Sequence, residues 1–119
     1  MIGRVDEFGR ALVPIKLKNS TLPAVELDGW IDTGFVGELV LPRELIQSMN
    51  LVRSTMVLAS LADGTETLLE SFTCLIDWLG AEKKVEVIAS SGRLPLIGVG
   101  LLQAHQLIVD YPRKAISLI

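Results

Sequence analysis

Residues 30–42, WIDTGFVGELVLP, decide how the rest of this sequence is interpreted. The apolar run is interrupted by Asp32, Thr33 and Gly34, and a second apolar run ends at Pro42, a residue that can open a short helix. A carboxylate among buried apolar neighbours is unfavourable unless its hydrogen bonds are supplied or it shares a proton. Asp32 is therefore either the acceptor in a tight turn that Gly34 permits, or a residue with a chemical role.

An Asp-Thr-Gly tripeptide between hydrophobic strands resembles the active-site loop of the aspartic proteases. Those enzymes activate a water molecule between two carboxylates, each carried on an Asp-Thr-Gly or Asp-Ser-Gly loop. This chain carries one such loop, because residues 63–65 read Asp-Gly-Thr. A chain of this length with a single Asp-Thr-Gly loop carries only half of such a site. It resembles the retropepsin-like branch of these proteases, in which two identical subunits each supply one aspartate across a two-fold axis.

The length of 119 residues predicts a single domain spanning residues 1–119. Hydrophobic residues make up 50% of the chain but aromatic residues only 5%, so the core must consist of Leu, Val and Ile, which favours strands. The net charge of −3 argues against a nucleic-acid partner, because no basic stripe is present to neutralise phosphates.

The single cysteine, Cys74, provides neither a disulfide framework nor a set of thiols for zinc, so a cytoplasmic location fits best. A catalytic Cys–His pair is a less favoured alternative, because the sole His105 lies in a distant apolar segment. The charged start of the sequence does not fit a signal peptide. The uncharged run over residues 94–109 is shorter than the about 18 residues of a membrane helix, so no membrane partner is expected.

Apolar alternation and turn residues predict an all-β chain with one or two short helices. Residues 77–80 are expected to form a turn. Strands are expected over residues 10–18, 24–31, 39–41, 55–61, 66–76, 84–90, 107–111 and 115–119, and a helix over residues 42–49.

A hairpin is predicted over residues 53–76, because Asp63 and Gly64 separate two alternating strands. The resemblance implies that this hairpin is the flap that closes over substrate, with Ala62, Asp63 and Gly64 at its tip among the substrate-binding residues. The alternative is an ordinary surface hairpin.

Residues 94–102, LPLIGVGLL, carry the second part of the resemblance. Retropepsin-like chains have two or three apolar residues, then Gly, then a short helix with a Leu-Leu pair, late in the sequence. The resemblance implies that Ile97 and Gly98 cross behind the Asp32 loop and support it, with Gly98 permitting close backbone approach.

Two positions depart from the usual pattern. Phe35 stands where Ala or Ser commonly follows Asp-Thr-Gly, so its ring either lines the cleft or narrows it. Gly100 stands where Asp or Asn often begins the late helix, a supporting position without a chemical role.

The resemblance implies a retropepsin-like closed β-barrel that forms a homodimer and acts as an aspartic endopeptidase on peptide or protein substrates. Asp32 would be catalytic, Thr33 and Gly34 would support the loop, and Phe35 would contact substrate; no metal or other cofactor is required. The alternatives are a catalytically silent dimerisation or peptide-binding module of the same fold, and an unrelated β-domain with a chance Asp-Thr-Gly turn. No residue pattern indicates the natural substrate.

Overall fold

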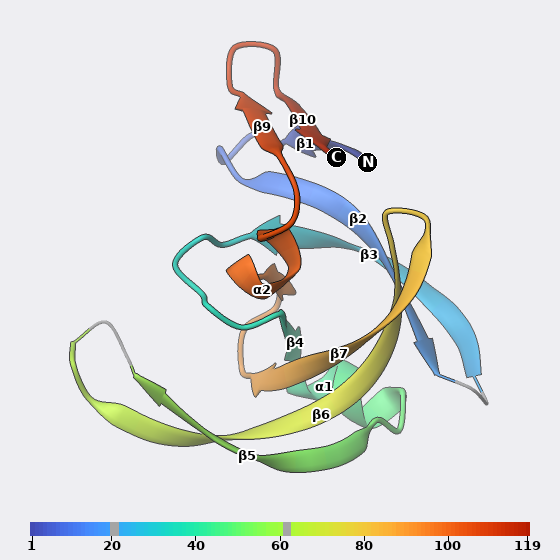
Figure 1. Cartoon of the computed structure of the whole chain (residues 1–119), viewed down its shortest axis with the longest axis vertical. Coiled ribbons are helices and arrows are strands. Elements are labelled where there is room, and N and C mark those ends of the chain that lie inside the picture. The colour runs from blue at the N-terminus through green and yellow to red at the C-terminus, as the bar shows by residue number, and fades with distance from the viewer. Residues whose placement is uncertain (20–21, 61–62) are drawn as a thin grey trace.

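The computed structural model describes residues 1–19, 22–60 and 63–119. Within these ranges the chain is built mainly from strands, and Figure 1 shows them wrapped around a common interior. The elements are β1 (Ile2–Val5), β2 (Ala11–Asn19), β3 (Leu22–Ile31), β4 (Leu39–Pro42), α1 (Arg43–Ser48), β5 (Val52–Ser60), β6 (Glu66–Trp78), β7 (Ala81–Ser90), β8 (Leu96–Ile97), α2 (Val99–Leu102), β9 (Leu107–Asp110) and β10 (Ala115–Leu118).

The strands form one sheet in the order β5-β6-β7-β4-β8-β3-β2-β1-β10-β9. An additional antiparallel pairing of β6 with β2, which matches Leu17 with Ile76, joins two non-neighbouring strands of this order. Strands β6, β7, β4, β8, β3 and β2 therefore close into a ring, as a barrel requires. The prediction of a mainly β chain with a closed barrel is confirmed.

The interior of the barrel is filled by aliphatic side chains, as the composition predicts. Strand alternation places one face of each strand inward. The largest fully buried side chains are Val13, Ile15, Leu17, Leu39, Leu41, Ile76, Val85, Val87, Ile97, Leu101, Ile116 and Leu118. Neither helix of the described ranges is long and apolar enough to cross a membrane.

A turn was expected over residues 77–80, but only the last two of these residues form it. Strand β6 continues through Trp78, which pairs with Ala81, and only Leu79 and Gly80 form the turn, both with positive φ angles of 51° and 87°. Such a two-residue turn matches the twist of a hairpin. Trp78 stays in the strand because its indole is buried and its Nε1 donates to the carbonyl of Leu101 at 3.1 Å.

One strand was not predicted. Residues Ile2–Val5 form β1, which pairs with β2 on one side and with β10 on the other. The segment carries Gly3 and Arg4 and shows no apolar alternation, so its strand conformation depends on its partners. Gly3 packs so closely on β2 that a Cβ atom there would lie 2.1 Å from the carbonyl oxygen of Leu12.

Candidate active site

Asp32 follows directly on β3, at the point where the chain leaves the barrel. The parallel pairing of β3 with β8 aligns Ile31 with Ile97, and the N–H of Asp32 donates to the carbonyl of Ile97 at 2.9 Å. The side chain of Asp32 is half-buried. It therefore lies at the edge of the core, where an ionised carboxylate is still reached by water.

A local turn fixes the carboxylate. Oδ1 of Asp32 accepts the N–H of Gly34 at 2.9 Å, and the main-chain carbonyl of Asp32 accepts the N–H of Phe35 at 3.2 Å. This is the turn role that the sequence allowed for Asp32. Within the described part of the chain, Oδ2 has no hydrogen-bond partner. One oxygen is thus used to orient the group, and the other is available to a water molecule or a second carboxylate.

The loop over residues 32–38 is held from behind by residues 97–100. In addition to the bond from Asp32, this segment donates three main-chain hydrogen bonds to the loop. They run from Gly98 to Glu38 at 2.9 Å, from Val99 to Phe35 at 2.8 Å and from Gly100 to Gly37 at 2.9 Å. Ile97 and Gly98 thus lie directly behind the loop and are bonded to it.

Gly98 is required by the closeness of this contact. A Cβ atom at Gly98 would lie 2.1 Å from the carbonyl oxygen of Gly37 and 2.5 Å from Cδ2 of Phe35. Real Cβ atoms do not approach backbone so closely, so any other residue would push the loop away. The sequence signal for this position was the apolar-apolar-Gly pattern.

The far end of the loop is tied to the barrel through Glu38. Its Oε1 accepts the N–H of Glu86 on β7 at 2.9 Å, and its Oε2 lies 3.7 Å from Nζ of Lys83. This contact was not predicted from the sequence, because its partners are separated from the loop by 45 residues or more. Glu38 therefore belongs with the supporting residues of the loop.

Phe35 lies against two glycines and lines a cavity. Its ring occupies the space that a Cβ atom at Gly37 would need, 2.4 Å from Cζ, and it also lies against Gly98. A cavity of about 310 Å³ opens beside it. The lining residues are Gly34, Phe35, Val36 and Gly37 from the loop, Val57, Leu58, Ala59, Ser60 and Leu69 from the hairpin, and Glu86 and Ile88 from β7.

The described hairpin residues that were predicted to bind substrate are not among the residues that line this cavity. Asp63 and Gly64 are exposed at the hairpin tip and are not among the residues that line the cavity. Ala62 lies outside the described residues. The hairpin contacts the cavity through its β5 side and Leu69, which sequence reasoning missed because only the fold shows which face of a strand covers the loop.

The tip itself is ordered by a local turn. Oδ1 of Asp63 accepts the hydroxyl of Thr65 at 2.7 Å and the N–H of Thr65 at 2.9 Å. These hydrogen bonds lower the pKa of Asp63 from its usual value. Gly64 has a φ of 86°, which glycine adopts without steric cost.

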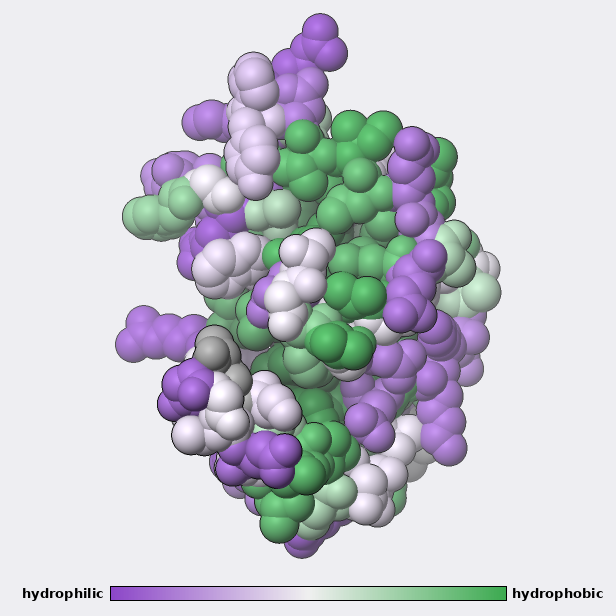
Figure 2. All heavy atoms as spheres, turned by 60° about the vertical axis from the view of Figure 1, so that its left-hand side comes forward, coloured by the Kyte–Doolittle hydropathy of each residue, from purple (hydrophilic) through white to green (hydrophobic). Residues whose placement is uncertain are grey.

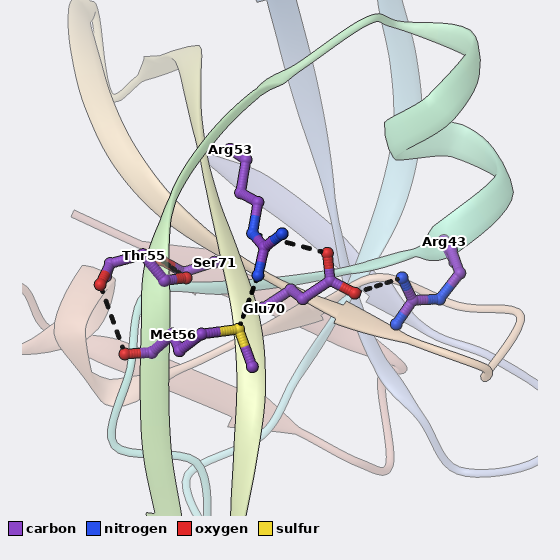
Figure 3. A network of polar contacts seen from close by, with 6 residues as sticks. All are labelled: Arg43, Arg53, Thr55, Met56, Glu70 and Ser71. Atoms are coloured by element: carbon purple, nitrogen blue, oxygen red, sulfur yellow. Dashed lines mark hydrogen bonds and ion pairs between the residues drawn. The ribbon is translucent and has the colours of Figure 1, made fainter.

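The base of the hairpin is tied to α1 by ion pairs (Figure 3). Glu70 on β6 accepts from Nη1 of Arg43 at 3.1 Å and lies 3.8 Å from Nε of Arg53 on β5. The buried hydroxyl of Ser71 donates to the carbonyl of Thr55 at 3.2 Å, next to an irregularity in the β5–β6 register between residues 53 and 55. The hairpin is thus anchored here, while among the described residues 56–60 and 66–70 form strand pairs only with each other.

A second cavity, of about 420 Å³, is lined by Trp30, Ile31, Asp32, Thr33 and Leu96. Trp30 and Asp32 are two residues apart and project to the same side of the chain. The guanidinium of Arg10 lies 5.7 Å from the Trp30 ring and 5.1 Å from the exposed ring of Phe8. This stack beside Asp32 was not predicted from the sequence.

The alternative chemistries receive no support from the geometry. The buried thiol of Cys74 contacts the carbonyls of Lys18 and Leu75, and burial raises its pKa. His105 instead lies edge-on against Trp78, with ring centroids 6.3 Å apart. Among the described residues, no group of three or more His, Cys, Asp or Glu side chains is placed to hold a metal ion.

Comparisons with known proteins point to one architecture. No family model matches the sequence, and no curated protein matches it. A retropepsin-like aspartic protease from Rickettsia conorii is similar in structure, with a TM-score of 0.69 and 16% identity over 99% of this chain and 88% of that chain. The EIAV protease in complex with the inhibitor HBY-793 has a TM-score of 0.58 and 16% identity over 80% of this chain and 86% of that chain. The retroviral protease-like domain of Ddi1 from Leishmania major has a TM-score of 0.55 and 14% identity, over 92% and 87%.

Proposed function

Because the chain has a retropepsin-like fold, we propose that it is an aspartic endopeptidase that works as a homodimer, with one Asp32 from each copy. The observation that carries this proposal is the geometry of Asp32. Its Oδ1 is fixed by the N–H of Gly34, its Oδ2 is open, and the carboxylate borders a cavity of about 420 Å³. A single chain supplies only half of the pair of carboxylates that this chemistry needs.

In the dimer, the two Asp32 carboxylates lie about 3 Å apart and cannot both be charged, so they share one proton. The ionised carboxylate takes a proton from the bridging water, whose oxygen attacks the peptide carbonyl carbon. The protonated carboxylate donates to the carbonyl oxygen as that oxygen gains negative charge. The hydrogen bond from Gly34 keeps each carboxylate in the orientation that the shared proton requires.

The substrate would lie between the loop and the hairpin as an extended peptide. The cavity beside Phe35 is lined by the loop on one side and by β5 and Leu69 of the hairpin on the other. Apolar side chains dominate this lining, with Glu86 as its charged member. We therefore expect the cavity to accept an apolar substrate side chain and to disfavour an acidic one.

A catalytically silent module of the same fold is the second candidate, and it rests on the bulk of Phe35 next to Asp32. A ring at this position narrows the space in which substrate backbone would lie. The ring packs onto Gly37 and Gly98, however, and leaves about 310 Å³ beside it. The remaining space favours the endopeptidase.

The deciding experiment is cleavage of an unfolded protein and of a mixed peptide library, from acid to neutral pH, at a protein concentration at which sedimentation shows a dimer. The Asp32→Asn variant should lose cleavage while remaining folded and dimeric. Asp28→Asn is the matched control, because Asp28 lies on β3, the strand that leads to Asp32, but pairs with Arg4 at 2.9 Å. Cleavage that survives in Asp32→Asn would show that another protein in the sample or another residue is responsible. Absence of cleavage by a dimeric wild type would favour the silent module.

A further inference from the structure

The side chain of Arg10, directly before β2, is held in place by the turn that precedes it. Its Nε donates to Oδ2 of Asp6 at 2.7 Å. The other carboxylate oxygen of Asp6 accepts the main-chain N–H groups of Phe8 and Arg10, at 3.0 and 2.9 Å. The side chain of Asp6 is only 12% exposed. This carboxylate is therefore committed to the turn, and it orients the guanidinium of Arg10.

Two aromatic rings contact the same guanidinium. Its Cζ lies 5.1 Å from the ring centre of Phe8 and 5.7 Å from that of Trp30. A cation over the face of an aromatic ring within about 6 Å is attracted to it. The rings and Asp6 together restrict the conformations of a long side chain, so less entropy is lost when that side chain binds a ligand.

The outer end of the guanidinium is left open. Within residues 1–19, 22–60 and 63–119, Nη1 and Nη2 of Arg10 form no hydrogen bond or ion pair. The same part of the chain contains no buried side-chain nitrogen or oxygen that lacks a partner, so solvent reaches both groups. Two such nitrogens can bind one carboxylate through two parallel hydrogen bonds.

The turn does not need this open end. Asp6 and Arg10 are also joined by a main-chain hydrogen bond of 3.0 Å, and the N–H of Gly9 donates to the carbonyl of Asp6 at 3.0 Å. Gly9 has a φ of 81°, which glycine adopts without steric cost. Main-chain bonds and Asp6 therefore close the turn, and the two Nη groups have no part in it.

Trp30 places the guanidinium beside the candidate site. Its ring contacts Arg10, and it also lines the cavity of about 420 Å³ that Asp32 borders. In Figure 1 the turn between β1 and β2 and the loop between β3 and β4 project to the same side. Figure 2 turns this side forward and shows hydrophobic residues over much of its upper half, with hydrophilic residues around them. A charged group of a ligand that enters such a surface needs a fixed partner of opposite charge.

We propose that Arg10 binds a carboxylate of the peptide substrate, so that the chain selects peptides with an acidic side chain close to the cleaved bond. This inference rests on the proposed function, because it concerns a peptide that lies against Asp32. The acidic side chain passes Trp30, and its carboxylate accepts hydrogen bonds from Nη1 and Nη2. The cavity beside Phe35 has Glu86 as its charged member, so the two cavities select different side chains.

Two peptides that differ in one side chain test the proposal. A library cut by the wild type should show Glu or Asp enriched at one position near the cleaved bond. A peptide with Glu at that position should have a KM about tenfold lower than the same peptide with Gln, at similar kcat, because hydrogen bonds between charged groups contribute this much to binding. Arg10→Met keeps an apolar stem, removes the donors, and should abolish the difference.

Arg4→Met is the matched control. Arg4 lies on the neighbouring strand β1 and pairs with Asp28 at 2.9 Å, so this variant removes the same charge from a place outside the aromatic contacts of Arg10. It should keep the preference for Glu. A preference that survives in Arg10→Met would overturn the proposal, as would a wild type that cuts both peptides equally well.

Replacement of the charge gives a sharper readout. Arg10→Lys should keep only part of the preference, because an ammonium group cannot form two parallel hydrogen bonds. Arg10→Glu should favour a peptide with Lys at the same position over one with Glu. A full preference for Glu in either variant would contradict the carboxylate site, and Arg10→Lys and Arg10→Met decide the matter if Arg10→Glu does not fold.

The free C-terminus of a peptide offers the same chemistry as an acidic side chain. The Gln peptide is therefore assayed with a free and with an amidated C-terminus. Equal KM values for these two peptides would support the side chain as the source of the carboxylate. A KM that is about tenfold lower for the free C-terminus, with the difference lost in Arg10→Met, would overturn the assignment to a side chain.

Binding without cleavage separates this inference from the proposed function. Fluorescence anisotropy of labelled Glu and Gln peptides gives their Kd values for Asp32→Asn, with and without Arg10→Met. An Arg10-dependent preference for Glu, in a protein whose wild type cuts nothing, would support the carboxylate site and contradict the endopeptidase. Asp32-dependent cleavage without any preference for an acidic residue would support the endopeptidase and overturn this inference.

Discussion

The loop over residues 32–38 and the β5–β6 hairpin border the same cavity, but they are held in different ways. The loop forms four main-chain hydrogen bonds with residues 97–100 and has no spare space at Gly98. Within the described ranges, residues 56–60 and 66–70 of the hairpin form strand pairs only with each other, and β5 forms one end of the sheet. The side of the site that carries the carboxylate is therefore fixed, and the side that covers it can move while breaking few contacts.

This difference suits the proposed chemistry. A carboxylate that must share a proton with its counterpart has to be held within a narrow range of positions. A cover over an extended peptide has to open and close. The loop and the hairpin should therefore respond differently to similar substitutions.

The largest effect is expected from the same substitution made in both regions. Gly98→Ala should lower the free energy of unfolding by about 3 kcal/mol, because the new methyl group meets the carbonyl of Gly37 and the loop must shift. Gly64→Ala at the tip should cost about 1 kcal/mol, because nothing lies within 4 Å of its Cβ position and only its positive φ is unfavourable. Urea unfolding of the wild type and of both variants measures these two losses in the free energy of unfolding. Equal losses would show that the two regions are held alike.

Phe35→Ala should lower the free energy of unfolding by about 2 kcal/mol, because a half-buried ring that packs on Gly37 and Gly98 is removed. The cavity beside it should widen, so cleavage should shift toward larger apolar side chains. Val36→Ala, an exposed neighbour that also lines the cavity, serves as the control. Thermal unfolding and a peptide library measure the two effects. A Phe35→Ala chain as stable as the wild type would mean that the ring does not support the loop.

At the hairpin base, Glu70→Gln should lower the free energy of unfolding by less than about 1 kcal/mol, because its ion pairs with Arg43 and Arg53 are largely exposed. Its effect on the hairpin should be clearer, with faster amide exchange at residues 56–60 and a higher KM. Glu82→Gln, which removes an exposed partner of Lys18 elsewhere in the sheet, is the control. Hydrogen exchange that is equally fast in both variants would argue against an anchoring role for Glu70.

The smallest effect concerns the tip. The hydrogen bonds from Thr65 lower the pKa of Asp63, so the folded turn favours the ionised form. This contribution is present above the usual pKa of an Asp side chain and is lost as the pH falls through the lowered value. Thr65→Val removes the hydroxyl donor and should raise the pKa of Asp63 toward its usual value, which an NMR titration measures. An unchanged pKa would mean that the hydrogen bond from the N–H of Thr65 is enough to lower the pKa of Asp63 without the hydroxyl.

The sequence predicted most of the elements, because alternation and turn residues are local signals. Strands β2, β3, β4 and β7, the hairpin of β5 and β6, the closing strands β9 and β10, and the helix after Pro42 lie close to their expected places. β1 was missed, because residues 2–5 become a strand only through pairing with β2 and β10. The turn after β6 begins two residues late, because burial of Trp78 extends the strand.

For the candidate site, the sequence could point only to residues whose spacing is itself the signal, and their roles stay a prediction. Asp32, Thr33 and Gly34 are adjacent, and Ile97 and Gly98 belong to a short pattern, so both segments could be recognised without a structure. Arg10 beside Trp30 could not be recognised, because nothing in the sequence relates residues twenty positions apart. The same holds for Leu69 and Ile88 in the cavity.

The sequence by itself determined that the chain is built from aliphatic strands and that one aspartate is carried on a glycine turn, because alternation, composition and turn chemistry act over a few residues. Only the tertiary structure decided what surrounds that aspartate. Closure of the barrel through β6 and β2 and the support from residues 97–100 both depend on pairing between distant segments. Such pairing follows from which strands can bury their apolar faces together, a property of the whole chain and not of any one segment.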